Sequence, residues 1–153
     1  MAVRIEVTYS KQLSGPKKFD EALKYFLNVE QSIPSNFPGL QSFKPLGSDV
    51  YEWAFEKISY SGYDFQIQFQ TKFIFSKTAA DIVPHNSKGT ELSGRWEFSE
   101  GTGGGTNLNF KAAFATELSI PSLFKSMATG LLQKEITKLF DRYSDNVAKV
   151  LSP

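Results

Sequence analysis

The chain has 153 residues, a length typical of one domain with a substantial core, and its formal net charge is only +1. This near-neutral charge argues against binding to a nucleic acid or an anionic membrane, since such partners usually require an excess of basic residues. The sequence has no cysteine, which excludes a disulfide framework, a thiolate zinc site and a cysteine nucleophile.

The first residues alternate between apolar and polar side chains. One side of this segment carries Val3, Ile5, Val7 and Tyr9. The alternation predicts a half-buried strand. The segment lacks the apolar stretch of a signal peptide, and no later run approaches the roughly 20 residues of a membrane span. We therefore expect a cytoplasmic protein with no integral membrane association.

Two helices are predicted next. Ser14-Gly15-Pro16 indicates a helix start, because proline is tolerated in a first helical turn. Apolar residues then follow at helical spacing, at Phe19, Ala22, Leu23, Phe26, Leu27 and Val29. The motif Ile33-Pro34-Ser35-Asn36 disrupts this spacing and leaves room for only a short second helix.

The hydrophobic period changes to two at Phe37-Pro38-Gly39. The alternation predicts six strands, near Leu40–Leu46, Val50–Ile58, Asp64–Phe75, Thr78–His85, Leu92–Glu100 and Asn107–Ser119. The connections between them are short and rich in turn residues. Strands joined so closely form antiparallel hairpins, since a parallel crossover needs about a dozen residues or more.

The predicted strands have one apolar and one polar side. In the segment 64–75 the apolar side carries Phe65, Ile67, Phe69, Thr71, Phe73 and Phe75. The other side carries Gln66, Gln68, Gln70 and Lys72. The sheet therefore has one wet face and one apolar face that another element must cover.

The last 30 residues supply that cover. A helix is predicted from Pro121 to about Val150, because apolar residues recur there at steps of three and four. Such a helix is roughly 45 Å long, which matches the width of a curved sheet. We predict one α+β domain over residues 1–153, with about seven antiparallel strands in the order β-α-α-β6-α wrapped around the C-terminal helix.

This order of strands and helices resembles the START-related, or SRPBCC, helix-grip superfamily. The resemblance covers the whole chain and includes Phe37-Pro38-Gly39-Leu40, the turn Gly103-Gly104-Gly105-Thr106 and the helix Pro121–Leu151. The superfamily includes proteins like polyketide cyclases/dehydratases, coenzyme Q-binding proteins and an accessory subunit of carbon monoxide dehydrogenase. The resemblance implies a deep cavity between the inner sheet face and the terminal helix, which often holds a hydrophobic or amphipathic ligand. Members range from carriers to enzymes, so the fold leaves the function open.

Phenylalanine accounts for 14 of the 153 residues, which indicates either a thick aromatic core or an aromatic-lined cavity. We expect a cavity, because a long sheet that faces a single helix leaves space away from their contact. The candidate ligand-binding residues are Trp53, Phe55, Phe65, Phe69, Thr71, Phe73, Trp96, Phe98, Phe110, Phe114, Thr116, Met127 and Leu131. The tryptophan NH groups and the threonine hydroxyls either orient a polar ligand end or are satisfied within the structure.

Four residues are candidates for acid–base catalysis, and none belongs to an evident catalytic set. His85 is the only histidine and shares strand parity with Asp81, so the two are candidates to line one rim. Apolar neighbours leave the facing of their strand ambiguous, and the alternative is an exposed histidine at a strand end. Glu135 lies at the margin of the helical stripe and Tyr143 within it. A buried Glu135 is a candidate proton donor or acceptor, and the alternative is a solvated carboxylate.

Metal and nucleotide sites receive little support. One histidine and no cysteine argue against a transition-metal site, and no compact acidic cluster suggests a carboxylate site. The glycine-rich segment 101–106 lacks the Lys-Ser/Thr of a phosphate loop and joins two strands, so we interpret it as a flexible turn. We expect no metal and no cofactor.

Two functions remain. The first is non-catalytic binding or carriage of a small lipid, isoprenoid or quinone-like ligand between the sheet and the C-terminal helix. The alternative is an enzyme like the polyketide cyclases/dehydratases, in which polar cavity residues transfer protons. A module that regulates a protein partner ranks last, because the glutamine-rich outer face offers no obvious docking patch.

Overall fold

The computed structural model describes residues 2–60 and 62–152. The elements are β1 (Ala2–Gly15), α1 (Phe19–Leu27), α2 (Val29–Asn36), β2 (Leu40–Gly47), β3 (Val50–Phe55), β4 (Ile58–Tyr60), β5 (Tyr63–Phe65), β6 (Gln68–Phe75), β7 (Ala79–His85), β8 (Thr90–Glu100), β9 (Thr106–Ser119) and α3 (Lys125–Leu151). Short 3-10 helices occupy Thr102–Gly104 and Ser122–Phe124.

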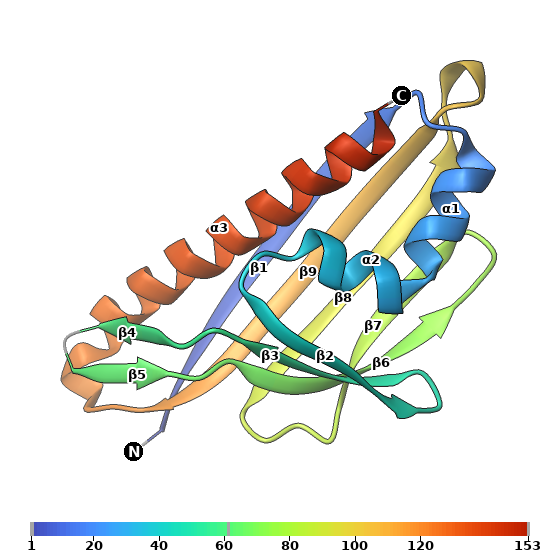
Figure 1. Ribbon diagram of the computed structural model, residues 1–153. Helices are drawn as coiled ribbons and strands as arrows, with labels where there is room; N and C mark the ends of the chain where they lie inside the picture. Colours follow the sequence, from blue (N-terminus) through green and yellow to red (C-terminus); the bar gives the residue numbers. More distant parts are fainter. Residues whose placement is uncertain (1, 61, 153) are drawn as a thin grey trace.

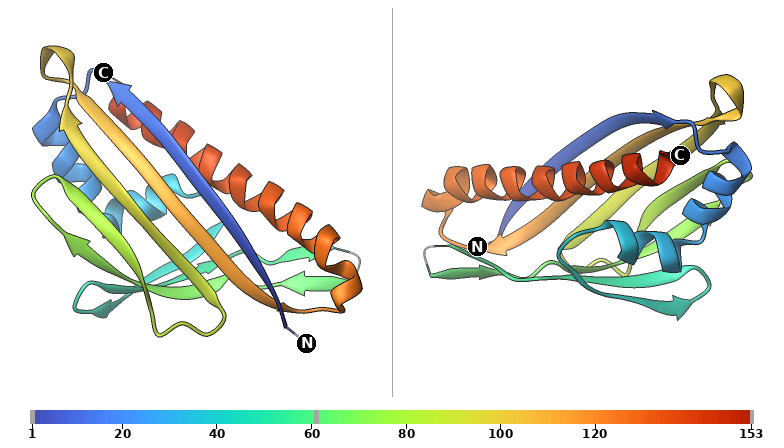
Figure 2. Two further views of the ribbon diagram at one scale, coloured as in Figure 1. Left: turned by 180° about the vertical axis from the view of Figure 1, so that it is seen from behind. Right: turned by 45° about the horizontal axis from the view of Figure 1, so that its top comes forward.

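Seven strands form one antiparallel sheet in the order β1-β9-β8-β7-β6-β3-β2. From β6 to β9 each strand pairs with the next along the chain, whereas β1 pairs with β9 and closes that side of the sheet. The sheet curves around α3, which runs along β1, and α1 and α2 cover the same face (Figure 1). Figure 2 shows this arrangement from behind and tilted with its top forward. The predicted α+β helix-grip architecture is confirmed.

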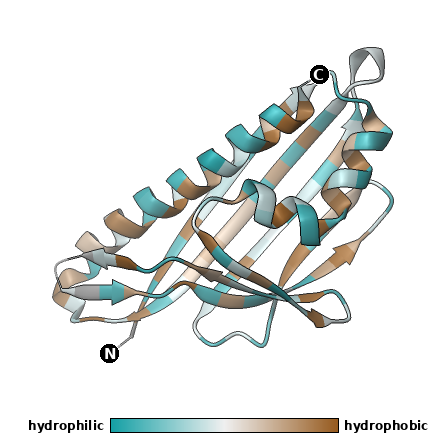
Figure 3. Cartoon of the chain, viewed as in Figure 1, coloured by the Kyte–Doolittle hydropathy of each residue, from teal (hydrophilic) through white to brown (hydrophobic). Residues whose placement is uncertain are grey.

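Alternating hydropathy produces the core. Hydrophobic and hydrophilic residues alternate along the strands, and α3 has a hydrophobic side (Figure 3). The inward residues of the sheet are buried, as is the facing side of α3. The largest fully buried side chains include Trp53, Phe73, Phe110, Tyr143 and Val147. The apolar inner face and the helical stripe therefore meet as the sequence predicts.

The first strand is longer than predicted, and the helix start predicted at Ser14-Gly15-Pro16 is wrong. β1 pairs with β9 without interruption as far as Gly15, which lies opposite Thr106. The backbone NH of Lys17 then donates to the carbonyl oxygen of Leu151 at 3.0 Å. These backbone contacts keep the segment extended, and α1 begins only at Phe19.

Two predicted strands, near 50–58 and 64–75, are each divided. The ladder between β3 and β6 ends where Ala54 faces Gln68. Beyond that point β4 and β5 form a separate two-stranded sheet that lies near the start of α3 (Figure 1). Phe65 belongs there to a second core cluster, with Ile5, Leu132 and other apolar residues. This part of the chain leaves the main sheet beside the middle of α3, where the candidate site lies.

The long terminal helix is confirmed, with a later start than Pro121. A 3-10 turn over Ser122–Phe124 precedes α3, which begins at Lys125 and continues for 27 residues. At its other end the carbonyl of Leu151 accepts the hydrogen bond from Lys17. The helix is thus tied at its last turn to the segment that follows β1.

Candidate ligand-binding groove

Aromatic rings fill most of the space between α3 and the sheet. The remaining inner cavity has a volume of about 20 Å³, which holds about one water molecule. It is lined by Phe37, Trp53, Phe55, Ile67, Phe69, Leu92, Phe114, Ile136, Leu139 and Phe140. Every lining side chain is apolar apart from the indole NH. The deep cavity that the resemblance implies is therefore small in this chain.

Ring stacking accounts for the small volume. Trp53 lies 5.3 Å from Phe69 and 6.3 Å from Phe55 between ring centroids, with nearly parallel planes. From the helical side, Phe37 stacks on Tyr143 at 4.1 Å with an interplanar angle of 14°. Such pairs add stability beyond the burial of their area, so the rings hold the interior closed.

A larger groove lies directly outside this cavity. Its volume is about 530 Å³, within the range of roughly 300–1,000 Å³ that is usual for ligand sites. It is lined by Pro38, Gly39, Phe55, Glu56, Lys57, Ile58, Ser59, Ile67, Leu131, Glu135, Leu139 and Arg142. Phe55, Ile67 and Leu139 line the groove and the cavity alike, so these three side chains separate the two spaces.

Three elements shape the groove. Leu131, Glu135, Leu139 and Arg142 lie on one side of α3, because they are spaced at three or four residues. The chain between β3 and β4 forms the opposite wall, where it leaves the main sheet. Gly39 has φ of +75° in the turn before β2, a conformation that favours glycine, and lies next to Leu139.

Charged groups surround the apolar floor of the groove. The lining includes the acids Glu56 and Glu135 and the bases Lys57 and Arg142. Lys57 has an exposed contact of 3.9 Å with Asp64, which adds little stability. Within the described part of the chain, no ion pair of Arg142 or Glu135 is found. The groove is therefore amphipathic, with charges of both signs at its rim.

The structure distributes the predicted ligand-binding residues over several places. Trp53, Phe55, Phe69 and Phe114 line the inner cavity, and Phe55 and Leu131 line the groove. Four more are buried core residues that line neither space: Phe73, Trp96, Phe98 and Phe110. Phe65 belongs to the second core cluster, and Met127 is 38% exposed on α3.

Several lining residues were absent from the sequence prediction. Ile67 follows the strand parity that predicted its neighbours, and Ile136, Leu139 and Phe140 belong to the apolar stripe of the last helix. Phe37 lies in the turn motif before the second predicted strand. Strand alternation could have predicted Ile67, and the apolar stripe of the last helix could have predicted the other three. The position of Phe37 depends on the packing of α2, which neither pattern describes.

The two predicted threonines bond within the protein. Trp53 Nε1 donates to the hydroxyl oxygen of Thr71 at 2.8 Å, and both side chains are fully buried. The hydroxyls of Thr116 and Thr90 lie 2.7 Å apart on neighbouring strands. Both threonine hydroxyls therefore form hydrogen bonds within the protein. Of the two roles considered for them, this is the structural one, and not the orientation of a polar ligand end.

Trp96 and Tyr143 form a second polar position in the core. Trp96 Nε1 is buried, and the Tyr143 hydroxyl is the polar group near it. Tyr143 is buried on α3, and desolvation raises the pKa of its phenol, an effect that the nearby indole NH of Trp96 partly offsets. Neither residue lines the groove.

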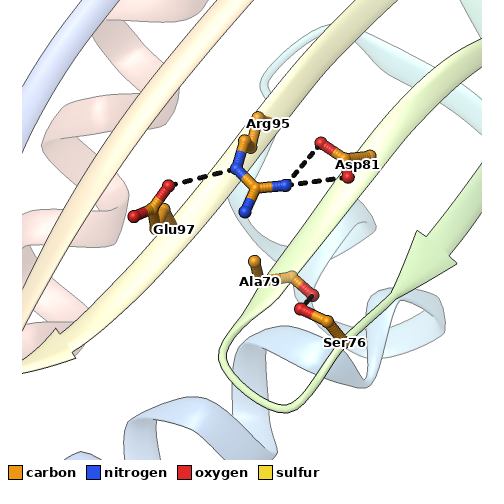
Figure 4. Close-up of polar contacts among 5 residues, drawn as sticks. All are labelled: Ser76, Ala79, Asp81, Arg95 and Glu97. Carbon is orange, nitrogen blue, oxygen red and sulfur yellow. Dashed lines mark hydrogen bonds and ion pairs between the residues drawn. The ribbon is translucent and has the colours of Figure 1, made fainter.

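Asp81 and His85 lie on the outer face of the sheet, away from the groove. Arg95 Nη1 donates to both carboxylate oxygens of Asp81, at 2.8 and 2.9 Å, and its Nε donates to Glu97 (Figure 4). His85 is exposed at the end of β7 and faces Gln70 in the ladder. Their neighbour Ile82 points inward, so Asp81 and His85 point outward and do not line a cavity rim.

The described residues contain no group of three His, Cys, Asp or Glu side chains arranged to hold a metal ion. In the same part of the chain, no helix combines the length and apolarity needed to cross a membrane.

Of the four acid–base candidates, Glu135 alone lines the groove, and its side chain is half-buried.

No family model matches the sequence, and comparison with curated proteins gives no match. Solved structures do match. TTHA0849 from Thermus thermophilus is 14% identical with a TM-score of 0.60, over 95% of this chain and 98% of that one. Ara h 8.0201 is 13% identical with a TM-score of 0.53, over 94% and 99%. This chain has the START-like helix-grip fold.

A third helix-grip structure is the di-domain ARO/CYC StfQ from the steffimycin biosynthetic pathway. It is 14% identical with a TM-score of 0.55, over 96% of this chain and 50% of the StfQ chain. At 14% identity, the similarity to StfQ supports a shared fold and nothing about function. The function has to be argued from the groove and the core of this chain.

Proposed function

We propose that this helix-grip domain binds a small, largely apolar ligand in the groove between α3 and the β3–β4 segment. The apolar part of the ligand lies over Phe55, Ile67 and Leu139, and its polar end meets the charged rim. The domain acts as a binding or carrier protein.

One observation carries this proposal: the groove of about 530 Å³ and the inner apolar cavity share three lining side chains. A ligand that displaces the Leu139 side chain enters the interior without breaking a backbone hydrogen bond of the sheet. Apolar contact there stabilises a bound molecule by about 25 cal/mol per Å² of apolar surface removed from water. The fold similarity to Ara h 8.0201 and StfQ is consistent with this use of the space between sheet and helix.

The test is a titration with an uncharged apolar dye whose emission rises in apolar surroundings. Leu139→Trp fills the passage between groove and cavity, and we expect it to weaken dye binding at least about tenfold, or 1.4 kcal/mol. Leu46→Trp is the matched control, because Leu46 is 51% exposed in the β2–β3 hairpin. Equal binding by both variants, or no binding by the natural protein, contradicts the proposal. Native mass spectrometry of protein purified from cells then identifies the ligand's mass.

Glu135 supports a second candidate function, an enzyme that transfers a proton to or from a ligand in the groove. A half-buried carboxylate beside an apolar floor is a suitable general acid or base. Under this alternative, Glu135→Gln retains the bound ligand and stops its conversion, as followed by mass spectrometry. If the natural protein and Glu135→Gln release the same unchanged ligand, the carrier function stands and the enzyme is excluded.

A further inference from the structure

The pairing between β7 and β8 stops before either strand ends. Its last paired residues are Ile82 and Gly94, although β7 continues to His85 and β8 begins at Thr90. Beyond that point in the described chain, β7 pairs with β6 alone and β8 pairs with β9 alone. The sheet therefore has a seam, where residues 83–85 and 90–93 face each other without a ladder.

A pocket lies on the outer face of the sheet at the open end of this seam. Its volume is about 290 Å³, and it is lined by Glu52, Gln68, Phe69, Gln70, Asn86, Lys88 and Thr90. Gln68 and Gln70 alternate with Phe69 along β6 and so point outward, whereas Phe69 is only 6% exposed. The outer pocket therefore has polar walls and one apolar ring at its base.

The same ring belongs to the inner cavity. Phe69 lines that cavity together with Trp53, Leu92 and Phe114. Its ring lies 5.3 Å from Trp53, with nearly parallel planes, and 6.2 Å from Phe114 between centroids. The Phe69 side chain thus lies between a pocket on the outer face and the interior of the protein.

The edge of β6 beside Phe69 is not confined by a neighbouring strand. The ladder between β6 and β7 begins at Gln70, which faces His85, so Phe69 lies one residue outside it in the described chain. The ring can therefore turn over this edge into the outer pocket without breaking a backbone hydrogen bond to β7. Such a movement adds the space of one phenyl ring to the inner cavity.

The lining of that space restricts what it binds. Trp53, Leu92 and Phe114 offer apolar contacts, and burial of a charged group there would be strongly unfavourable. An aromatic ring in the place of Phe69 regains its stacking on Trp53. The space therefore favours a small, uncharged aromatic molecule.

We propose that Phe69 is a gate in the sheet, and that its outward rotation opens a site for a small uncharged aromatic molecule against Trp53 and Phe114. In the bound state the Phe69 ring occupies the outer pocket and the ligand takes its former place. This site opens on the face of the sheet opposite α3, so it is separate from the groove and does not rest on the proposed function.

The test is a titration with fluorobenzene, followed by fluorine NMR. Gln70→Trp fills the outer pocket, so Phe69 cannot turn outward, and binding should weaken at least about tenfold. Ile74→Trp is the matched control and should bind as the natural protein does, because Ile74 is 51% exposed on the same strand and does not line the pocket. Equal binding by the two variants, or no binding by the natural protein, overturns the proposal. The apolar dye that tests the groove should bind Gln70→Trp unchanged, so the two sites can fail separately.

A second comparison shows whether Gln70→Trp acts through Phe69. Phe69→Ala has no ring to turn outward, so adding Gln70→Trp to it should leave fluorobenzene binding unchanged. In the natural protein, fluorobenzene should move the indole NH signal of Trp53 more than that of Trp96, because Trp53 stacks on Phe69. A tenfold loss in the Phe69→Ala background as well, or a larger shift of Trp96, overturns the gate.

Discussion

Gly15, the last residue of β1, lies directly against the backbone carbonyl of Leu151, the last residue of α3. A Cβ atom at position 15 would overlap that carbonyl, and backbone atoms cannot move aside as a side chain can. We expect Gly15→Ala to lower the free energy of unfolding by about 1–3 kcal/mol, as overpacking does. Gly130→Ala in α3 is the control, because a Cβ there meets nothing within 4 Å. It should stabilise by about 0.5–1 kcal/mol. Urea unfolding measures both, and equal stability of the two variants contradicts the close contact.

The filled interior predicts that a ligand site can be opened by truncation. Phe69→Ala removes a ring that lines the inner cavity and should cost about 3–5 kcal/mol of stability. The enlarged apolar space should bind benzene, which is expected to raise the midpoint of thermal unfolding. Phe75→Ala is the control, since Phe75 is 36% exposed and does not line the cavity. A benzene effect of the same size in both variants would disprove the prediction.

The raised pKa values of Tyr9 and Tyr51 predict that the protein loses stability at high pH. Desolvation is the main cause that raises the pKa of Tyr9 and of Tyr51 to about 12, from the ordinary value of 10.0. The unfolded state releases these protons first, so their contribution is complete below pH 10 and is lost as the pH rises toward 12. Tyr9 is partly exposed and the Tyr51 hydroxyl bonds to the exposed Glu30, so the slope should stay below the limit of about 1.4 kcal/mol per pH unit per proton. Urea unfolding between about pH 10 and pH 12 measures this slope of stability against pH.

The control for the pH effect is Tyr9→Phe, which removes one of the phenols whose pKa is raised. The Tyr9 hydroxyl donates to Asp141 at 2.8 Å, so the variant loses some stability at neutral pH as well. Its stability should fall less steeply between pH 10 and 12 than that of the natural protein. Parallel curves would show that Tyr9 is not linked to unfolding.

Charges at the groove predict opposite effects of two substitutions. With an aromatic sulfonate dye as ligand, Arg142→Gln should weaken binding by about threefold, because it removes a positive charge from the rim. Glu135→Gln should strengthen binding by a similar factor. An uncharged dye should bind both variants equally, and high salt should reduce both effects. Changes of the same sign in both variants would place the dye elsewhere.

Much of the fold could be predicted because the alternation is strict. Phe65 to Phe73 and Leu108 to Phe114 keep one parity, and their inward residues are buried. The end of β1 was missed, because residues 10–12 are polar on both sides and carry no alternation. The division at residues 56–57 and 66–67 was missed too, since it depends on how the β4–β5 pair packs against α3.

The site was harder to predict, because it depends on how side chains pack. Parity placed Trp53, Phe55 and Phe69 on the inner face, but the volume that their rings leave follows from stacking geometry. The facing of Asp81 was ambiguous in a strand with adjacent apolar residues, and its pairing with Arg95 shows the outward direction.

The pairing of β1 with β9 has a consequence for how the chain folds. Residues 2–15 find their partners at 106–119, roughly 100 residues later in the sequence. Loop closure over that distance is slow compared with hairpin formation, so the β6–β9 hairpins should assemble first. Until β1 arrives, one edge of β9 is open, and α3 lacks the strand along which it runs. Docking of the first strand is therefore expected to limit the rate of folding, and this interval is when the open edge of β9 is most exposed to pairing between molecules.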